Sequence, residues 1–113
     1  MHELSLCGAI ADIVTRRAED RSVDVIHVRI GQLRQVIPDT LLFCWSLVVA
    51  ETTLEGAELQ IERVAARLKC RACGDEFDLG NNVTFGCPAC GGLDSAVLAG
   101  EEFLVTALDL GKV

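Results

Sequence analysis

The chain has 113 residues, half of them apolar, and a formal net charge of −7. That length suits one domain with a real hydrophobic core, and Leu, Val, Ile and Ala must fill it because the chain has only four Phe, one Trp and no Tyr. The acidic balance argues against DNA or RNA as the main partner, since phosphate binding needs a basic surface.

The first residues, MHELSL, show no basic segment ahead of an apolar run, as a secretory signal would have. The longest apolar stretch, LLFCWSLVVA, is well short of the ~20 residues that a membrane-spanning helix needs. We therefore expect a reducing cytoplasmic environment. In that environment six cysteines indicate metal or redox chemistry rather than a disulfide scaffold.

The first half of the chain predicts a helix and then a strand. Residues 3–19 place apolar side chains at three- and four-residue steps, which is typical of an amphipathic helix; they are Leu6, Cys7, Ile10, Ala11, Ile13 and Val14. The segment VDVIHVRIG alternates apolar and polar residues and predicts a strand ending at Gly31. His27 then lies on the polar face of that strand, and we assign it no ligand role.

A second helix is expected from Pro38 to about Glu51, because Pro suits the first helical turn and Asp39 the positive end of the helix dipole. A second strand follows in AELQIERV. A helix between two strands usually makes them parallel. The segment EEFLVTALDL predicts a third strand whose apolar residues change phase, which a bulge near Thr106 would reconcile.

Four of the six cysteines form two CxxC pairs, Cys70-x2-Cys73 and Cys87-x2-Cys90. Each pair can turn both sulfurs toward one point, and two such pairs complete the tetrahedron that zinc accepts. Gly74 and the Gly91-Gly92 pair supply tight turns. The surrounding residues are too poor in apolar side chains to build a core of their own, so a bound metal would supply folding energy.

Two rivals to zinc stay open at these cysteines. A thioredoxin-like CxxC belongs to a βαβ unit, which is absent around these residues, and iron–sulfur centres use more varied spacings. We expect structural zinc, with all four positions filled by thiolate and none left for catalytic water.

His2 directly follows Met1, so the α-amino group, backbone amides and the imidazole are joined by short chelate geometry. Deprotonated amides would add nitrogen donors in one plane, an arrangement that Ni(II) and Cu(II) prefer. A histidine at position 2 is also a common accident. The local chemistry alone therefore leaves its role open.

Taken together, these residues resemble a known family. MHELSL at the start, the strand VDVIHVRIG, an LLF helix, EGAELQIE and the two CxxC pairs, the second within CPACG, occur in the same order in the hydrogenase nickel-incorporation proteins HypA and HybF. The resemblance runs over nearly the whole chain.

The resemblance implies a nickel metallochaperone rather than an enzyme. Such a protein passes Ni(II) toward the large subunit of [NiFe]-hydrogenase, or into urease maturation, and works with the GTPase HypB. The resemblance implies nickel ligation by His2, with the Met1 amine and the Glu3 amide nitrogen, and zinc ligation by Cys70, Cys73, Cys87 and Cys90. Asp39 aligns with a position that supports nickel binding in some members, although its place at a helix start explains it equally well.

We therefore expect an α+β fold: two helices with a small three-stranded mixed sheet, plus an inserted zinc-ribbon-like sub-domain. Residues 1–68 and 99–113 would form the nickel-binding part, and residues 69–98 the zinc-binding part. Three rival functions would leave other traces. A nucleic-acid-binding zinc ribbon needs a basic face, an enzyme needs Cys7 or Cys44 as an accessible nucleophile, and a redox switch needs oxidisable CxxC pairs.

Overall fold

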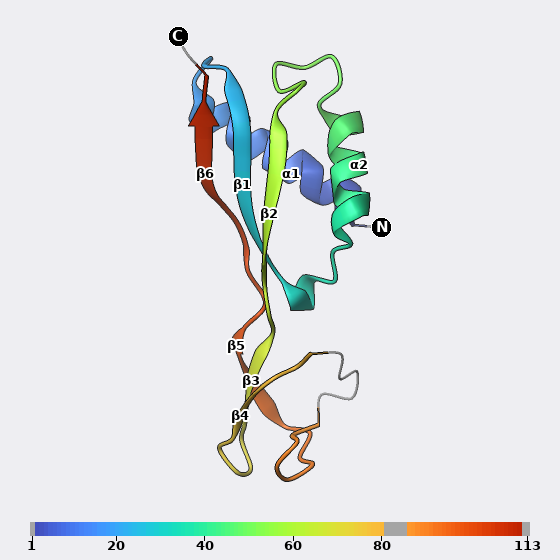
Figure 1. Cartoon of the computed structure of the whole chain (residues 1–113), viewed down its shortest axis with the longest axis vertical. Helices are drawn as coiled ribbons and strands as arrows, with labels where there is room; N and C mark the ends of the chain where they lie inside the picture. Colours follow the sequence, from blue (N-terminus) through green and yellow to red (C-terminus); the bar gives the residue numbers. More distant parts are fainter. Residues whose placement is uncertain (1, 81–85, 112–113) are drawn as a thin grey trace. The chain divides into compact units, whose positions relative to one another are not determined.

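The computed structural model describes residues 2–80 and 86–111. The chain divides into two compact units, which are visible in the ribbon of Figure 1. The first comprises residues 1–29, 36–62 and 104–113, and the second residues 30–35 and 63–103. The second unit is larger than the expected zinc-binding part, and the assignment of one metal to each unit stays a prediction.

In the first unit, helix α1 (Glu3–Ala18) buries one stripe of side chains. Its buried apolar positions follow helical steps: Cys7, Ile10, Val14 and Ala18. The expected helix is confirmed. Ile13, however, is exposed and Leu6 is only partly buried, because both lie one residue away from the stripe that faces the core.

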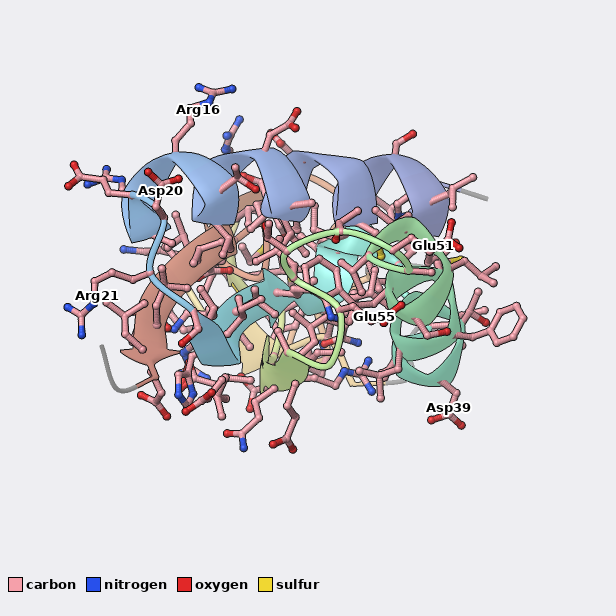
Figure 2. The ribbon with its side chains drawn as sticks, turned by 90° about the horizontal axis from the view of Figure 1, so that it is seen from above. Arg16, Asp20, Arg21, Asp39, Glu51 and Glu55 are labelled. Carbon is pink, nitrogen blue, oxygen red and sulfur yellow. The ribbon has the colours of Figure 1, made fainter. Side chains whose placement is uncertain are left out.

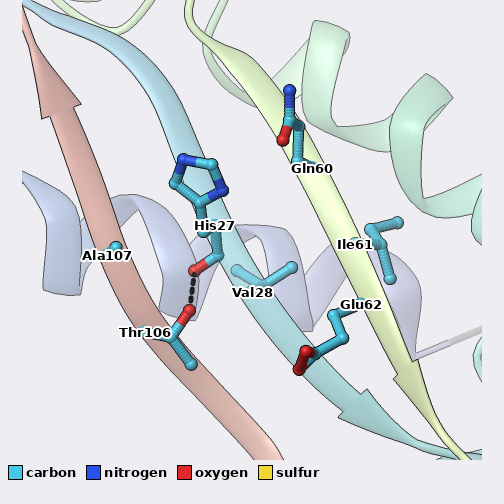
Figure 3. A pocket seen from close by; sticks show the side chains of 7 residues that line it. All are labelled: His27, Val28, Gln60, Ile61, Glu62, Thr106 and Ala107. Atoms are coloured by element: carbon cyan, nitrogen blue, oxygen red, sulfur yellow. Dashed lines mark hydrogen bonds between the residues drawn. The ribbon is translucent and has the colours of Figure 1, made fainter.

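The sheet of the first unit has the strand order β2-β1-β6. Its strands are β1 (Val23–Gly31), β2 (Glu58–Val64) and β6 (Phe103–Leu110). Strands β1 and β2 run in the same direction and β6 runs opposite to them, so the sheet is mixed as expected (Figure 3). In β6, Thr106 and Ala107 are both exposed, and the burial pattern changes phase there as the sequence predicts.

Helix α2 (Pro38–Val48) connects β1 to β2 and packs against α1. Helix α1 covers one face of the sheet and leaves the other face to polar side chains (Figures 2 and 3). The second helix expected from the sequence is confirmed, but α2 ends three residues before the expected end, and a loop then leads to β2. Cys44, which lies in the longest apolar stretch of the chain, is only partly buried.

The second unit contains a second small sheet of strand order β4-β3-β5. It is formed by β3 (Arg67–Cys70), β4 (Glu76–Asp78) and β5 (Ser95–Ala99), and a short 3-10 turn, η1 (Gln32–Arg34), belongs to the same unit. Both pairings are antiparallel, with Leu68 opposite Phe77 and Cys70 opposite Ser95. The sequence pattern does not predict these short strands.

Gly31 and Gly100 meet within the second unit. The Leu33 N–H donates to the Gly100 carbonyl at 2.8 Å, and a Cβ at position 31 would lie 2.0 Å from that oxygen. Only glycine fits at such a distance from backbone atoms. Within the described ranges, no helix is both long and apolar enough to cross a bilayer.

Candidate metal centres

The four cysteine sulfurs of the CxxC pairs lie within 4.8 Å of one another. The Cys70 and Cys90 sulfurs are 3.6 Å apart, and those of Cys73 and Cys87 are 3.7 Å apart. Four thiolates placed tetrahedrally at ~2.3 Å from zinc would be about 3.8 Å apart. Both sulfur–sulfur distances therefore match a tetrahedral zinc site, and the remaining pairs of sulfurs are close enough to complete it.

Backbone turns bring each pair together. The Gly74 N–H donates to the Cys70 carbonyl at 2.9 Å, and the Gly91 N–H to the Cys87 carbonyl at 2.7 Å. Both glycines have positive φ, +79° and +76°, a conformation that costs glycine little. The two halves of the site thus repeat one local design, in which a glycine after each pair turns the chain back.

Gly92 has a different role from the turn that the sequence suggested for it. Its φ is not in the left-handed region, but a Cβ there would lie 3.3 Å from the Cys90 sulfur and 3.5 Å from the Cys70 sulfur. The Gly92 N–H donates to the Cys90 sulfur at 3.4 Å. The absent side chain therefore lets the backbone approach the sulfurs and donate to one of them.

Ser95 is a residue that sequence reasoning missed. It lies opposite Cys70 in the β3–β5 pairing, and its buried hydroxyl has no hydrogen-bond partner in the part of the chain that the structure describes. Buried hydroxyl groups normally have partners, and metal-bound thiolates accept hydrogen bonds. No local sequence signal marks this residue, because its position depends on the register of two strands.

The thiols of the cluster differ in acidity. The pKa of the Cys70 thiol is lowered to about 7, first by the Cys73 N–H and also by the Ala72 N–H. The Asp75 N–H acts to lower the pKa of Cys73, but burial and the neighbouring thiols of Cys87, Cys90 and Cys70 raise it to about 12. Four thiolates this close repel one another, so a cation is needed to ionise them all.

The predicted nickel ligands lie at the start of α1. His2 is exposed, and its carbonyl accepts the first helical bond, from the Leu6 N–H at 3.0 Å. Glu3 is almost fully buried, and its carboxylate accepts a hydrogen bond of 3.3 Å from the Ile37 N–H just before α2. Met1, whose amine was also predicted as a ligand, lies outside the described residues.

The two predicted centres belong to different units, His2 and Glu3 to the first and the four cysteines to the second. Asp39 is exposed in the first turn of α2, as expected for a helix-start carboxylate. Among the described residues, Asp39 belongs to no group of three or more side chains that could hold a metal ion.

Cys7, one of the two rival cysteines, is not placed as an accessible nucleophile. Cys7 is fully buried and its thiol donates to the Leu41 carbonyl at 3.4 Å. Burial first, and then the nearby Cys44 and Glu3, raise the pKa of the Cys7 thiol to about 11. A neutral, enclosed thiol of this kind is a poor nucleophile.

His27 lies on the open polar face of the sheet, beside a pocket of about 320 Å³ that Gln60, Glu62 and Thr106 also line (Figure 3). Its Nε2 lies 3.1 Å from the Asp109 carboxylate, and its carbonyl accepts a bond from the Thr106 hydroxyl at 3.3 Å. His27 is therefore held as a surface residue of the sheet.

Comparison with known proteins finds relatives over nearly the whole chain. The family model described as "Hydrogenase/urease nickel incorporation, metallochaperone, hypA" matches residues 1–110. The hydrogenase maturation factor HypA of Geotalea uraniireducens is 42% identical over 110 residues, which cover 97% of this chain and 99% of that protein. HypA of Streptomyces avermitilis is 36% identical over 112 residues, covering 96% and 86%.

A solved structure supports the fold independently. The solution structure of the Ni metallochaperone HypA from Helicobacter pylori superposes with a TM-score of 0.67, covering 97% of each chain at 20% identity. A family match over nearly the whole chain, together with relatives of similar length, leaves one conclusion: this chain belongs to the HypA family of nickel-incorporation metallochaperones, which act in hydrogenase maturation.

Proposed function

We propose that this protein binds Ni(II) at its N-terminus and delivers it during maturation of [NiFe]-hydrogenase, with urease as an alternative recipient. The observation that carries the proposal is the exposed His2 at the start of α1, in a chain whose residues 1–110 match a nickel-incorporation family. The proposed ligands are the His2 imidazole and amide, the Met1 amine and the Glu3 amide nitrogen.

The start of a helix suits such a site for a physical reason. The first N–H groups of a helix have no acceptor one turn earlier in the chain, and the first helical bond of α1 begins at the Leu6 N–H. Deprotonating the amides of His2 and Glu3 therefore breaks no helical hydrogen bond, although it removes the bond from the Glu3 N–H to the Glu3 carboxylate. The Glu3 carboxylate, held by the Ile37 N–H, anchors this turn while the imidazole stays exposed and able to exchange its cargo.

The four cysteines would hold a structural zinc ion: Cys70, Cys73, Cys87 and Cys90. When bound, zinc supplies folding energy and fixes the two CxxC turns. The Ser95 hydroxyl and the Gly92 N–H would hydrogen-bond to the thiolates. With four thiolates on the metal, no position remains for a reacting water, and we propose no enzymatic activity.

The proposed partners are the GTPase HypB and the large subunit of [NiFe]-hydrogenase, in the cytoplasm. Support comes from the family description and from the six cysteines, none of which is paired in a disulfide. Nucleic acid is not a proposed partner, because the net charge is −7.

The test uses the two histidines of the chain as a matched pair. Untagged protein is titrated with Ni(II) by calorimetry, with the absorption bands of nitrogen-ligated Ni(II) as a second readout. We expect His2→Ala to lose stoichiometric binding and His27→Ala to bind as the unchanged protein does. Adding one residue before Met1 should also weaken binding, because it moves the amine out of the chelate.

Unchanged nickel affinity in His2→Ala, with zinc content and circular dichroism intact, would contradict the terminal site. We also expect nickel affinity to fall as the pH falls, since imidazole, amine and amide nitrogens must lose protons to bind.

A further inference from the structure

Helix α2 exposes an apolar surface that no described residue covers. This surface, the α2 patch, consists of Ile37, Leu42, Phe43 and Leu47. Phe43 is 64% exposed and Leu47 57% exposed, and their four-residue spacing places them side by side along the helix. Leu41 and Trp45, on the other side of the helix, are buried, so α2 is packed in the unit and still presents large apolar side chains to solvent.

The segment of the chain that carries the α2 patch is acidic. Residues 35–62 contain five carboxylates and no Lys, Arg or His. Asp39 lies one turn before Phe43, and Glu51 and Glu55 follow the end of the helix, so along the chain carboxylates precede and follow the patch (Figure 2 labels the three). In the part of the chain that the structure describes, no cation pairs with Asp39 or Glu51.

The α2 patch lies beside the start of α1. The Ile37 N–H donates to the Glu3 carboxylate, and the Cys7 thiol donates to the Leu41 carbonyl, so the first two turns of α1 contact the first two turns of α2. Leu4, next to Glu3, exposes a further large apolar side chain. A molecule bound at the Ile37 end of the patch would therefore be adjacent to Glu3 and its neighbours.

Exposed apolar surface rimmed by charge marks interaction sites in soluble proteins. A symmetric contact between two copies would set Asp39 and Glu51 of one copy against the same acidic surface of the other, which costs free energy. A partner of opposite charge gains from the same carboxylates.

We propose that the α2 patch is the docking surface for a protein partner that presents apolar side chains flanked by Lys or Arg, and that this partner is thereby placed beside the N-terminus. Its placement next to a metal site rests on the proposed function, but the docking itself does not.

The test probe is a synthetic helical peptide of about five turns with Leu on one face and Lys on the other. A second peptide carries Glu in place of Lys. Binding to the full-length, zinc-loaded protein without nickel is measured by calorimetry and mapped by amide chemical shifts. We expect the Lys peptide alone to bind, to shift residues 37–50 and Leu4, and to weaken as salt is added.

The variant Phe43→Glu/Leu47→Glu should weaken Lys-peptide binding about tenfold or more, as loss of central apolar contacts does. The control Val97→Glu/Leu98→Glu changes two exposed apolar residues of β5 and should bind as the unchanged protein does. Both variants should keep zinc content and nickel binding. If the unchanged protein did not bind nickel, the proposed function would be overturned, and the docking proposal would not.

Three results would overturn the docking proposal. They are equal binding of the two peptides, binding that Phe43→Glu/Leu47→Glu leaves unchanged, and a dimer in sedimentation that this variant dissolves. The last would make a second copy of the chain the occupant of the patch.

Discussion

The two units of this protein are stabilised in different ways. In the first unit, side chains of α1, α2 and the sheet are fully removed from water without any metal ligand among them, including Ile10, Val14, Ile26, Val28 and Leu41. The core of the second unit consists of Ala66, Leu68, Cys70, Phe77, Leu79 and Cys87. Two of those six residues are candidate zinc ligands, so the second unit has little apolar surface to bury without its metal.

The comparison teaches that the two candidate metal sites are stabilised differently: the cysteine cluster by its metal, and the N-terminus by an apolar core. A small apolar core cannot offset the conformational entropy of ordering its chain, and a structural metal replaces it. The start of α1, by contrast, rests on a unit with an ordinary core. A nickel site there could fill and empty without unfolding the unit that carries it.

The largest expected effect is that of removing zinc. Chelation, or Cys70→Ser, should remove most of the ~10 kcal/mol or more that a structural zinc site contributes. Amide hydrogen exchange should then lose protection in residues 66–79 and keep it in residues 10–18 and 26–29. Cys44→Ser, in the first unit, is the control and should keep both sets protected. Protection of residues 66–79 in the chelated protein would show that the second unit folds without metal.

Shortening a buried side chain of the first unit tests the other half of the comparison. Leu41 is fully buried and its neighbour Leu42 is 42% exposed. Leu41→Ala should cost about 2–5 kcal/mol of unfolding free energy, and Leu42→Ala much less. Urea unfolding followed by the fluorescence of Trp45, the single tryptophan, measures both, and equal losses would mean that α2 is not packed as described.

The pH dependence of zinc binding sharpens the role of the thiols. Zinc binds thiolates, so protons compete with it and affinity falls as the pH falls. The pKa of Cys70, lowered to about 7, lets this thiol ionise near neutrality, whereas the pKa of Cys73, raised to about 12, keeps it protonated until a metal ion binds the sulfur and the proton is released to water. From about pH 8 to about pH 6 we expect affinity to fall by about a hundredfold or more. A chromophoric zinc indicator measures it, and a flat profile would contradict thiolate ligation.

The difference between the two units also explains which features of the fold the sequence could predict. Helix α1 and strand β1 follow from periodicity, because in each the apolar spacing matches one buried face. The strands β3, β4 and β5 have only three to five residues, too few for a periodic pattern, and cross-strand pairs and the CxxC turns set their register.

At the candidate sites, the cysteine spacing predicts the sulfur cluster because neighbouring residues alone bring each pair together. Ser95 and the contact of Gly92 with the sulfurs depend on tertiary structure, so the sequence could not predict them. The local chemistry of the N-terminus leaves the role of His2 undecided. Only the resemblance across the whole chain indicates that His2 is a nickel ligand.

The smallest expected effect compares two glycines, one in each unit. A Cβ at position 92 would crowd the sulfurs of Cys90 and Cys70, whereas at Gly8, in α1, it would meet no atom within 4 Å. Gly92→Ala should weaken zinc binding about tenfold, a cost of about 1–3 kcal/mol for a side chain placed in filled space. Gly8→Ala should leave zinc binding unchanged and raise the unfolding free energy by about 0.5–1 kcal/mol, because alanine favours a helix interior. Equal zinc affinity in the two variants would mean that the backbone at position 92 can move away from the sulfurs. The second unit would then tolerate changes at its metal site as readily as the first unit tolerates them on the surface of its helix.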